Sequence, residues 1–161
     1  MVRGQLTKAL DTTDLVYADL VVIAEDIIKP YLWEIDSLIQ VATNQDNLSN
    51  DDIRNLMFKL AMKSYSFSEI KEKSSLKAEC AEALRKEKYA KKFNESEGTV
   101  AFKENQATIE ITDEILAETV YGLVADLFKT KLDELHRVVD VLKTILMSRN
   151  SEAKLSQGVL E

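Results

Sequence analysis

The segment from Thr112 to Arg149 constrains the fold of this chain most, because it contains no proline and only one glycine. Its apolar residues recur at alternating steps of four and three, the spacing that keeps one face of an α-helix apolar. This apolar stripe contains Leu116, Val120, Leu123, Leu127, Phe128, Leu132, Leu135, Val139, Leu142 and Leu146. Thr112, with two acidic residues after it, is expected to cap the helix. A helix of roughly 36 residues would be about 54 Å long, so we expect it to pack on another long helix or another subunit.

Turn residues are scarce in the rest of the chain as well. The 161 residues include one proline and four glycines, too few for a many-stranded sheet, and the length suits one ordinary domain. We therefore expect a mainly α fold, either a long-helix bundle or a coiled-coil-like hairpin. The predicted parts are an acidic N-terminal helical segment (1–48), a long-helix core (49–150) and a flexible tail (151–161).

The first predicted helix begins at Thr12 or Thr13, where Asp14 in the first turn suits the helix dipole. Residues 1–11 have no strong pattern and are expected to form a mobile terminus. The apolar residues of this helix cover more than one face and predict deep burial: Leu15, Val16, Leu20, Ile23, Ile27 and Ile28. Pro30 predicts a kink or a restart, because proline removes a backbone donor.

A second helix is predicted from residue 50. The polar residues 43–50 read as a loop, and Ser49 followed by Asp52 resembles a capping box, in which each side chain bonds the other residue's backbone. The Ser-rich residues 64–75 predict a bend or break, after which a charged helix continues to about Phe93.

After this charged helix, the spacing of the apolar residues changes from a helical to an alternating pattern. Val100 and Phe102 alternate with small or polar residues, and Ile109 and Ile111 do the same after a polar turn. Alternation of this kind is typical of strands, so we expect a short β-hairpin near 99–111.

Charge is distributed unevenly along the chain, whose net charge is −7. Residues 11–52 carry ten acidic residues against Lys29 alone, whereas residues 71–103 carry nine basic residues against six acidic ones. This asymmetry indicates either different partners for the two ends of the chain or docking between them.

Residues with catalytic or metal-binding chemistry are few. Cys80 has no cysteine partner for a disulfide, and with His136 alone it cannot supply the usual ligands of a structural zinc site. The acidic residues of the last helix lack the Glu-x-x-His pairs of ferritin-like metal sites, and the chain has no glycine-rich phosphate loop. We therefore expect no enzyme activity, no cofactor and no small-molecule substrate.

The expected location is the cytoplasm. A lone cysteine fits a reducing compartment, and the most apolar stretch, Leu20 to Ala24, is too short to span a bilayer. No apolar run follows a basic start, so a signal peptide and a membrane partner are not expected.

The charged helix before residue 93 is the best candidate for a binding site. Its bases gather on a little over a third of the helix circumference, and aromatic residues lie beside them. Cationic groups that track phosphates and aromatic faces that stack on bases are the means by which single-stranded nucleic acid is held. The candidate residues are Lys73, Lys77, Arg85, Lys88, Lys91, Lys92, Tyr89 and Phe93. The alternative interpretation is a solvated lysine-rich face with aromatics that fill the core.

The residues from about Met57 to Leu155 resemble the phage recombination mediators of the UvsY type. The resemblance lies in the charged helix KAECAEALRKEKYAKKF, a short polar and aromatic insertion, and a long final helix that ends in VVDVLKTILMSRNSEAKL. Two features depart from the family pattern: the chain is acidic overall, and its first 52 residues have no counterpart.

The resemblance implies a homo-oligomeric ring that binds single-stranded DNA and helps to load a strand-exchange recombinase in place of a single-strand-binding protein. It assigns DNA binding to the basic helix and assembly to Leu132, Leu135, Val139, Leu142 and Leu146. The alternative from another class is a non-enzymatic structural or adaptor protein, such as a phage assembly factor or inhibitor, that acts through protein–protein contacts. Both functions predict an oligomer. If a phage encodes the chain, we expect it in the cytoplasm of the host cell.

Overall fold

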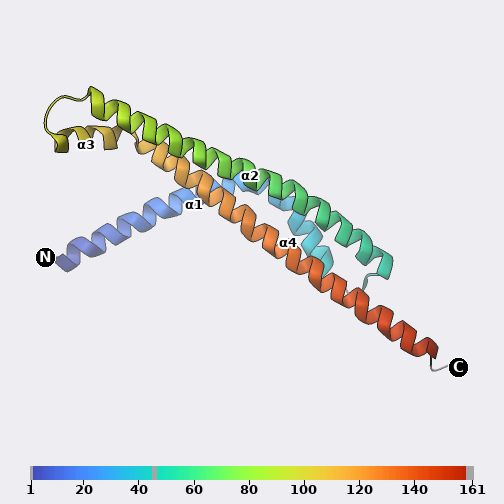
Figure 1. Cartoon of the computed structure of the whole chain (residues 1–161). Helices are drawn as coiled ribbons and strands as arrows, with labels where there is room; N and C mark the ends of the chain where they lie inside the picture. Colours follow the sequence, from blue (N-terminus) through green and yellow to red (C-terminus); the bar gives the residue numbers. More distant parts are fainter. Residues whose placement is uncertain (1, 45–46, 159–161) are drawn as a thin grey trace. The chain divides into compact units, whose positions relative to one another are not determined.

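The computed structural model describes the backbone of residues 2–44 and 47–158 and the side chains of residues 13–44 and 47–155. These parts of the chain form four α-helices and no strand (Figure 1). The helices are α1 (Val2–Thr43), α2 (Asn50–Glu95), α3 (Val100–Glu110) and α4 (Thr112–Gly158). The predicted mainly α fold is therefore confirmed. Across the described ranges, no helix has the length and apolar character needed to cross a lipid bilayer.

The prediction of a β-hairpin near 99–111 is wrong, because this segment forms helix α3. Thr99 caps the helix: its side chain accepts a hydrogen bond from the backbone N–H of Phe102 at 3.4 Å. Ala107 and Ile111, which are four residues apart, are buried, as expected for one face of a helix. The alternating apolar residues that suggested strands, such as Phe102 and Ile109, are exposed.

Three predicted helix ends also differ. Helix α1 begins at Val2 and continues through Pro30, so neither the mobile terminus at 1–11 nor a restart at the proline is observed for the described residues. Thr112 is the first residue of α4, and its hydroxyl donates to the carbonyl oxygen of Ile109 at 3.0 Å instead of capping the helix. Helix α4 continues past Arg149 to Gly158, so the predicted tail is helical as far as it is described, and residues 159–161 lie outside the described residues. The division into three parts otherwise stays a prediction.

The predicted start of α2 is confirmed by its capping box. The backbone N–H of Ser49 donates to the carboxylate of Asp52 at 3.1 Å, and the backbone N–H of Asp52 donates to the hydroxyl of Ser49 at 3.2 Å. The hydrogen bonds from Ser49 hold the pKa of Asp52 below its ordinary value. The predicted break in the Ser-rich stretch is absent, because α2 is continuous from Asn50 to Glu95. Hydroxyls in this stretch bond back to the helix, as Ser64 does to the carbonyl oxygen of Leu60 at 3.1 Å.

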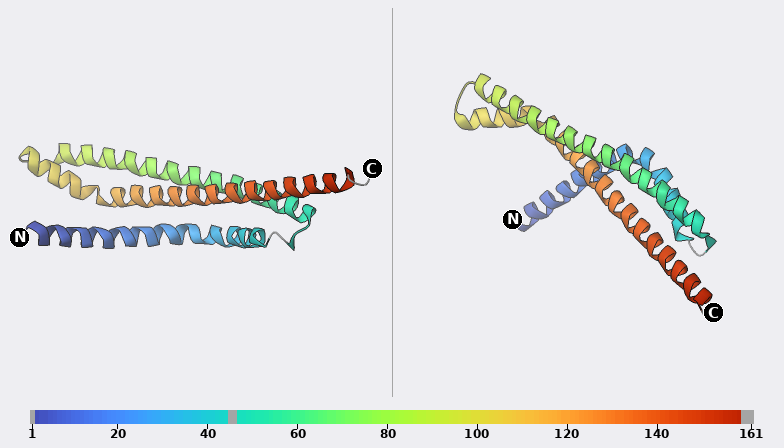
Figure 2. Two further views of the ribbon diagram at one scale, coloured as in Figure 1. Left: turned by 90° about the horizontal axis from the view of Figure 1, so that it is seen from below. Right: turned by 45° about the vertical axis from the view of Figure 1, so that its right-hand side comes forward.

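The chain divides into two compact units. Among the described residues, unit 1 contains those up to Ile28 and Lys71–Leu127, and unit 2 contains Lys29–Ile70 and those from Phe128 onward. In unit 1, the C-terminal part of α2 runs antiparallel to α3 and to the first part of α4 (Figure 2). Its buried apolar residues are mostly small: Ala24, Ile28, Ala81, Ala107, Ile111, Val124 and Ala125.

Unit 2 has an aromatic cluster where α1, α2 and α4 meet. Phe128 is fully buried, and its ring makes edge-to-face contacts with Tyr31 and Phe67 at centroid distances of 5.8 and 5.1 Å. The other buried apolar residues of this unit are Ile35, Ala42, Ile53, Leu56, Leu60, Leu132, Leu135 and Leu142. Each of the three helices thus contributes one apolar face to this core.

Candidate functional site

Three of the bases predicted to bind DNA form a row of ion pairs inside unit 1. We call this row the ion-pair ladder: Arg85 Nε with Glu118 at 2.8 Å, Lys88 with Glu114, and Lys92 Nζ with Glu110 at 3.6 Å. The bases advance along α2 while the acids recede along α4 and α3, as expected for antiparallel helices. The ladder therefore uses half of the predicted cationic set within the chain's own fold.

The carboxylate of Glu114 is the most enclosed charge of the ladder, with only 12% of its side chain exposed. A hydrogen bond from Lys88 lowers the pKa of Glu114, while burial acts in the opposite direction. The same bond raises the pKa of Lys88, again against the effect of burial. The second carboxylate oxygen of Glu114 is buried and has no hydrogen-bond partner among the described residues. Lys88 is therefore the main group that favours the ionised form of this acid.

The pKa shift of Glu114 predicts that the ladder stabilises the fold in a pH-dependent way. Its pKa is lower in the folded than in the unfolded chain, so the stabilisation is complete above about pH 4.3 and is lost as the pH falls through the lowered value. At alkaline pH, the stabilisation from Lys88, whose pKa is raised in the folded chain, is complete up to about pH 10.4. It is lost as the pH rises through the raised value. In urea unfolding, the chain should be more stable than Glu114→Gln at about pH 7, and the difference should shrink towards about pH 3.

The matched control for this prediction is Glu104→Gln. Glu104 is an exposed acid of α3 whose side chain has no ion pair among the described residues. This substitution should leave the urea midpoint nearly unchanged at both pH values. A stability difference for Glu114→Gln that stays constant from neutral to acid pH would contradict the role given to the ladder.

Most of the remaining residues of the predicted DNA-binding set also make contacts within the chain. Lys77 Nζ lies 5.0 Å from the centroid of the Tyr121 ring, and Tyr89 and Phe93 stack on each other at 6.3 Å. Lys73 also interacts within the chain. Among the described residues, Lys91 is the member of the set that is exposed and has no partner.

The acids of the ladder were missed by the sequence reasoning. Glu110, Glu114 and Glu118 follow one another at steps of four, which places them on one side of a helix. The bases Arg85, Lys88 and Lys92 follow at steps of three and four. The match between these two spacings was the signal that could have identified the ladder.

The residues assigned to assembly lie largely in the core of unit 2. Leu135 and Leu142 are fully buried and Leu132 is 7% exposed, so none of the three presents a surface to another copy. Val139 and Leu146 are half-buried. We therefore assign Leu132, Leu135 and Leu142 to the core, and the oligomer stays a prediction.

Apolar side chains are instead exposed on α1. Of the residues predicted to be deeply buried, Ile28 is buried and Leu20 is half-buried, but the others are exposed. The exposed side chains are those of Leu15, Val16, Ile23 and Ile27. The prediction failed for these four residues because unit 1 covers only the face of α1 that carries Ala24 and Ile28.

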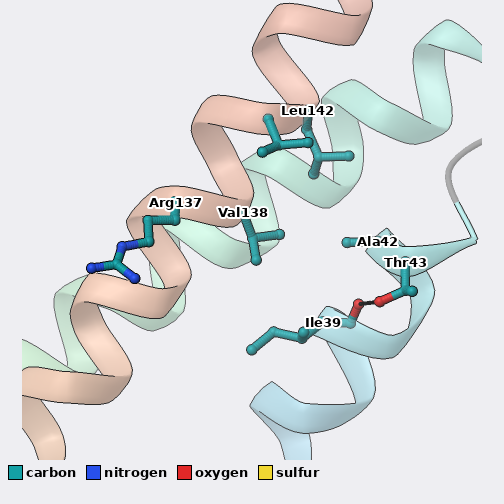
Figure 3. A pocket seen from close by; sticks show the side chains of 7 residues that line it. Ile39, Ala42, Thr43, Arg137, Val138 and Leu142 are labelled. Atoms are coloured by element: carbon teal, nitrogen blue, oxygen red, sulfur yellow. Dashed lines mark hydrogen bonds between the residues drawn. The ribbon is translucent and has the colours of Figure 1, made fainter.

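Unit 2 has an apolar pocket between α1 and α4 (Figure 3). The pocket has a volume of about 220 Å³ and is lined by Ile39, Ala42, Thr43, Arg137, Val138, Val141 and Leu142. The hydroxyl of Thr43 is satisfied by the carbonyl oxygen of Ile39 at 3.0 Å, and the guanidinium of Arg137 extends away from α1 (Figure 3). The pocket therefore suits an apolar side chain better than it suits a reacting substrate.

A second hollow of unit 2 lies between α1 and α2. Leu38, Phe58 and Met62 form its apolar part, and the 68% exposure of Phe58 shows how open it is. Lys63 and Glu34 line the same hollow and pair with each other. Both hollows of unit 2 are apolar surfaces without converging catalytic groups.

In the described ranges, no three His, Cys, Asp or Glu side chains lie close enough together to hold a metal ion. The thiol of Cys80 is free and exposed. Comparison with known protein families, curated proteins and solved structures gave no match.

Proposed function

We propose that the protein is a non-enzymatic helical adaptor that acts through protein–protein contacts. The observation that carries this proposal is the exposure of aliphatic side chains on one side of α1, with Val16 at 49%, Ile23 at 48% and Ile27 at 39%. A helix that is apolar on several faces is ordinarily covered on several faces. Unit 1 covers one face of α1, so a partner would cover another.

The state of the cationic residues also favours an adaptor over a DNA-binding recombination mediator. DNA phosphates would have to compete with Glu118, Glu114 and Glu110 for the bases of the ladder. Lysines and arginines bind nucleic acid by neutralising phosphates and releasing their counterions. Such binding needs several basic side chains that are available to the nucleic-acid backbone. Within the described part of the predicted set, Lys91 is the cation that meets this condition.

A titration with a fluorescent poly-dT oligonucleotide at two salt concentrations separates the two functions. The adaptor is expected to show negligible binding at low salt, and Lys91→Glu should change nothing, because too few phosphate contacts are available. Lys91 is the informative position, since replacing Lys88 or Lys92 also breaks the ladder. Tight binding that weakens steeply with salt, and that Lys91→Glu reduces, would contradict the proposal and favour the mediator.

A further inference from the structure

Four apolar residues of α1 form a continuous stripe within unit 1, in which three are exposed and Leu20 is half-buried. We call Val16, Leu20, Ile23 and Ile27 the α1 stripe. They follow one another at steps of four, three and four, the spacing by which one helix packs along another. A shallow hollow of about 370 Å³, lined by Thr13, Val16, Tyr17 and Leu20, lies at the N-terminal end of the stripe. The stripe thus has the pattern and the shape of a helix-packing surface that lacks its partner.

Carboxylates border the α1 stripe along one edge. Asp19 lies three residues after Val16 and four before Ile23, and Asp26 lies three residues after Ile23, so both are neighbours of the stripe on the helix surface. Both are exposed, and neither has a partner among the described residues. No lysine or arginine occurs in residues 13–28. The edge of the stripe is therefore purely acidic.

This edge argues against a second copy of the chain that packs antiparallel on the stripe. Antiparallel packing of α1 on α1 would bring Asp19 of one copy towards Asp26 of the other, and like charges at such positions are unfavourable. The chain's own basic helix is a poor alternative partner, because Arg85, Lys88 and Lys92 already pair with acids of unit 1. Charge complementarity instead requires lysines or arginines on a different protein.

We infer that the α1 stripe is the docking site for a basic amphipathic helix of a partner protein. This inference rests on the proposed adaptor function and specifies the chemistry of its partner. Apolar residues of the partner pack along Val16, Leu20, Ile23 and Ile27, while its cations face Asp19 and Asp26. Binding therefore depends on both apolar contact and charge, and it weakens as salt is added.

The test uses two synthetic helical peptides that share the same leucine stripe. One carries lysines beside the stripe and the other carries glutamates, and binding of each labelled peptide to the full chain is measured by fluorescence anisotropy. The lysine peptide should bind and the glutamate peptide should not. Ile23→Glu and Asp19→Lys/Asp26→Lys should each weaken binding of the lysine peptide by about tenfold or more.

Matched controls exist on the same helix. Val22→Glu introduces the same charge beside Ile23 at a residue that is 55% exposed but points about 100° away around the helix. Asp14→Lys/Glu25→Lys changes the net charge by the same amount as the double substitution at the stripe, but on the opposite side of α1. Both controls should keep the affinity within about twofold of the unchanged chain. Circular dichroism confirms that each variant remains helical.

Other results would contradict the basic partner. Equal binding of both peptides, or binding that the control substitutions weaken equally, overturns the basic partner. If neither peptide binds, the proposal of a basic partner is overturned as well. Sedimentation velocity then tests whether the adaptor function still holds. If the chain self-associates and Ile23→Glu makes it monomeric, the occupant is a second copy and the adaptor function survives. If the chain is monomeric and binds neither peptide but binds poly-dT, the adaptor function also fails.

Discussion

Replacing Phe128 with alanine is expected to lower the free energy of unfolding by about 3–5 kcal/mol. The side chain is fully buried in unit 2, and its ring contacts both Tyr31 of α1 and Phe67 of α2. Truncation would leave a cavity at the point where three helices meet and would remove two edge-to-face contacts. Urea unfolding followed by circular dichroism measures the change.

The control for this prediction is Phe58→Ala, which makes the same change at a side chain that is 68% exposed. It should alter the free energy of unfolding by less than about 0.5 kcal/mol. If the two alanine variants unfold at the same urea concentration, Phe128 does not have the central packing role described for unit 2.

The second large effect is expected at Leu135, which the sequence reasoning assigned to assembly. Because Leu135 is fully buried in unit 2, Leu135→Ala should lower the free energy of unfolding by about 2–5 kcal/mol. The comparison variant is Leu155→Ala on the same helix, where the leucine is 70% exposed and the loss should be less than about 0.5 kcal/mol. Sedimentation velocity on the same samples reports the mass. A Leu135→Ala chain of unchanged stability but smaller mass would restore the assembly role.

The features that could be predicted from the sequence depend on residues close together in the chain. The capping box of Ser49 and Asp52 involves neighbours three positions apart, so its spacing was sufficient to locate the start of α2. The scarcity of glycine and proline was sufficient for the mainly α class. The hairpin prediction failed because a short alternation of apolar residues is compatible with both strand and helix, and the capping role of Thr99 was not recognised.

The features that could not be predicted depend on which helices meet. The apolar periodicity of Leu135 was recognised, but periodicity does not show whether the covering helix belongs to the same chain or to another. In the same way, the clustering of Lys88 and Lys92 was correct as a pattern, while their acidic partners come from α3 and α4. Ile23 was predicted to be deeply buried but is exposed, because a helix with several apolar faces was expected to be covered on all of them.

The spacing of the ladder has a consequence for how unit 1 can assemble during folding. If α2 were displaced by one helical turn against α3 and α4, Arg85 would face Glu114, Lys88 would face Glu110, and Lys92 would face the neutral Gln106. Opposite charges would still meet at two positions, and like charges at none of these three. The charges thus hold the helices together but only weakly select their axial offset, which is left to the interior side chains. A nascent hairpin could therefore slide into its final alignment without crossing an electrostatic barrier at these positions.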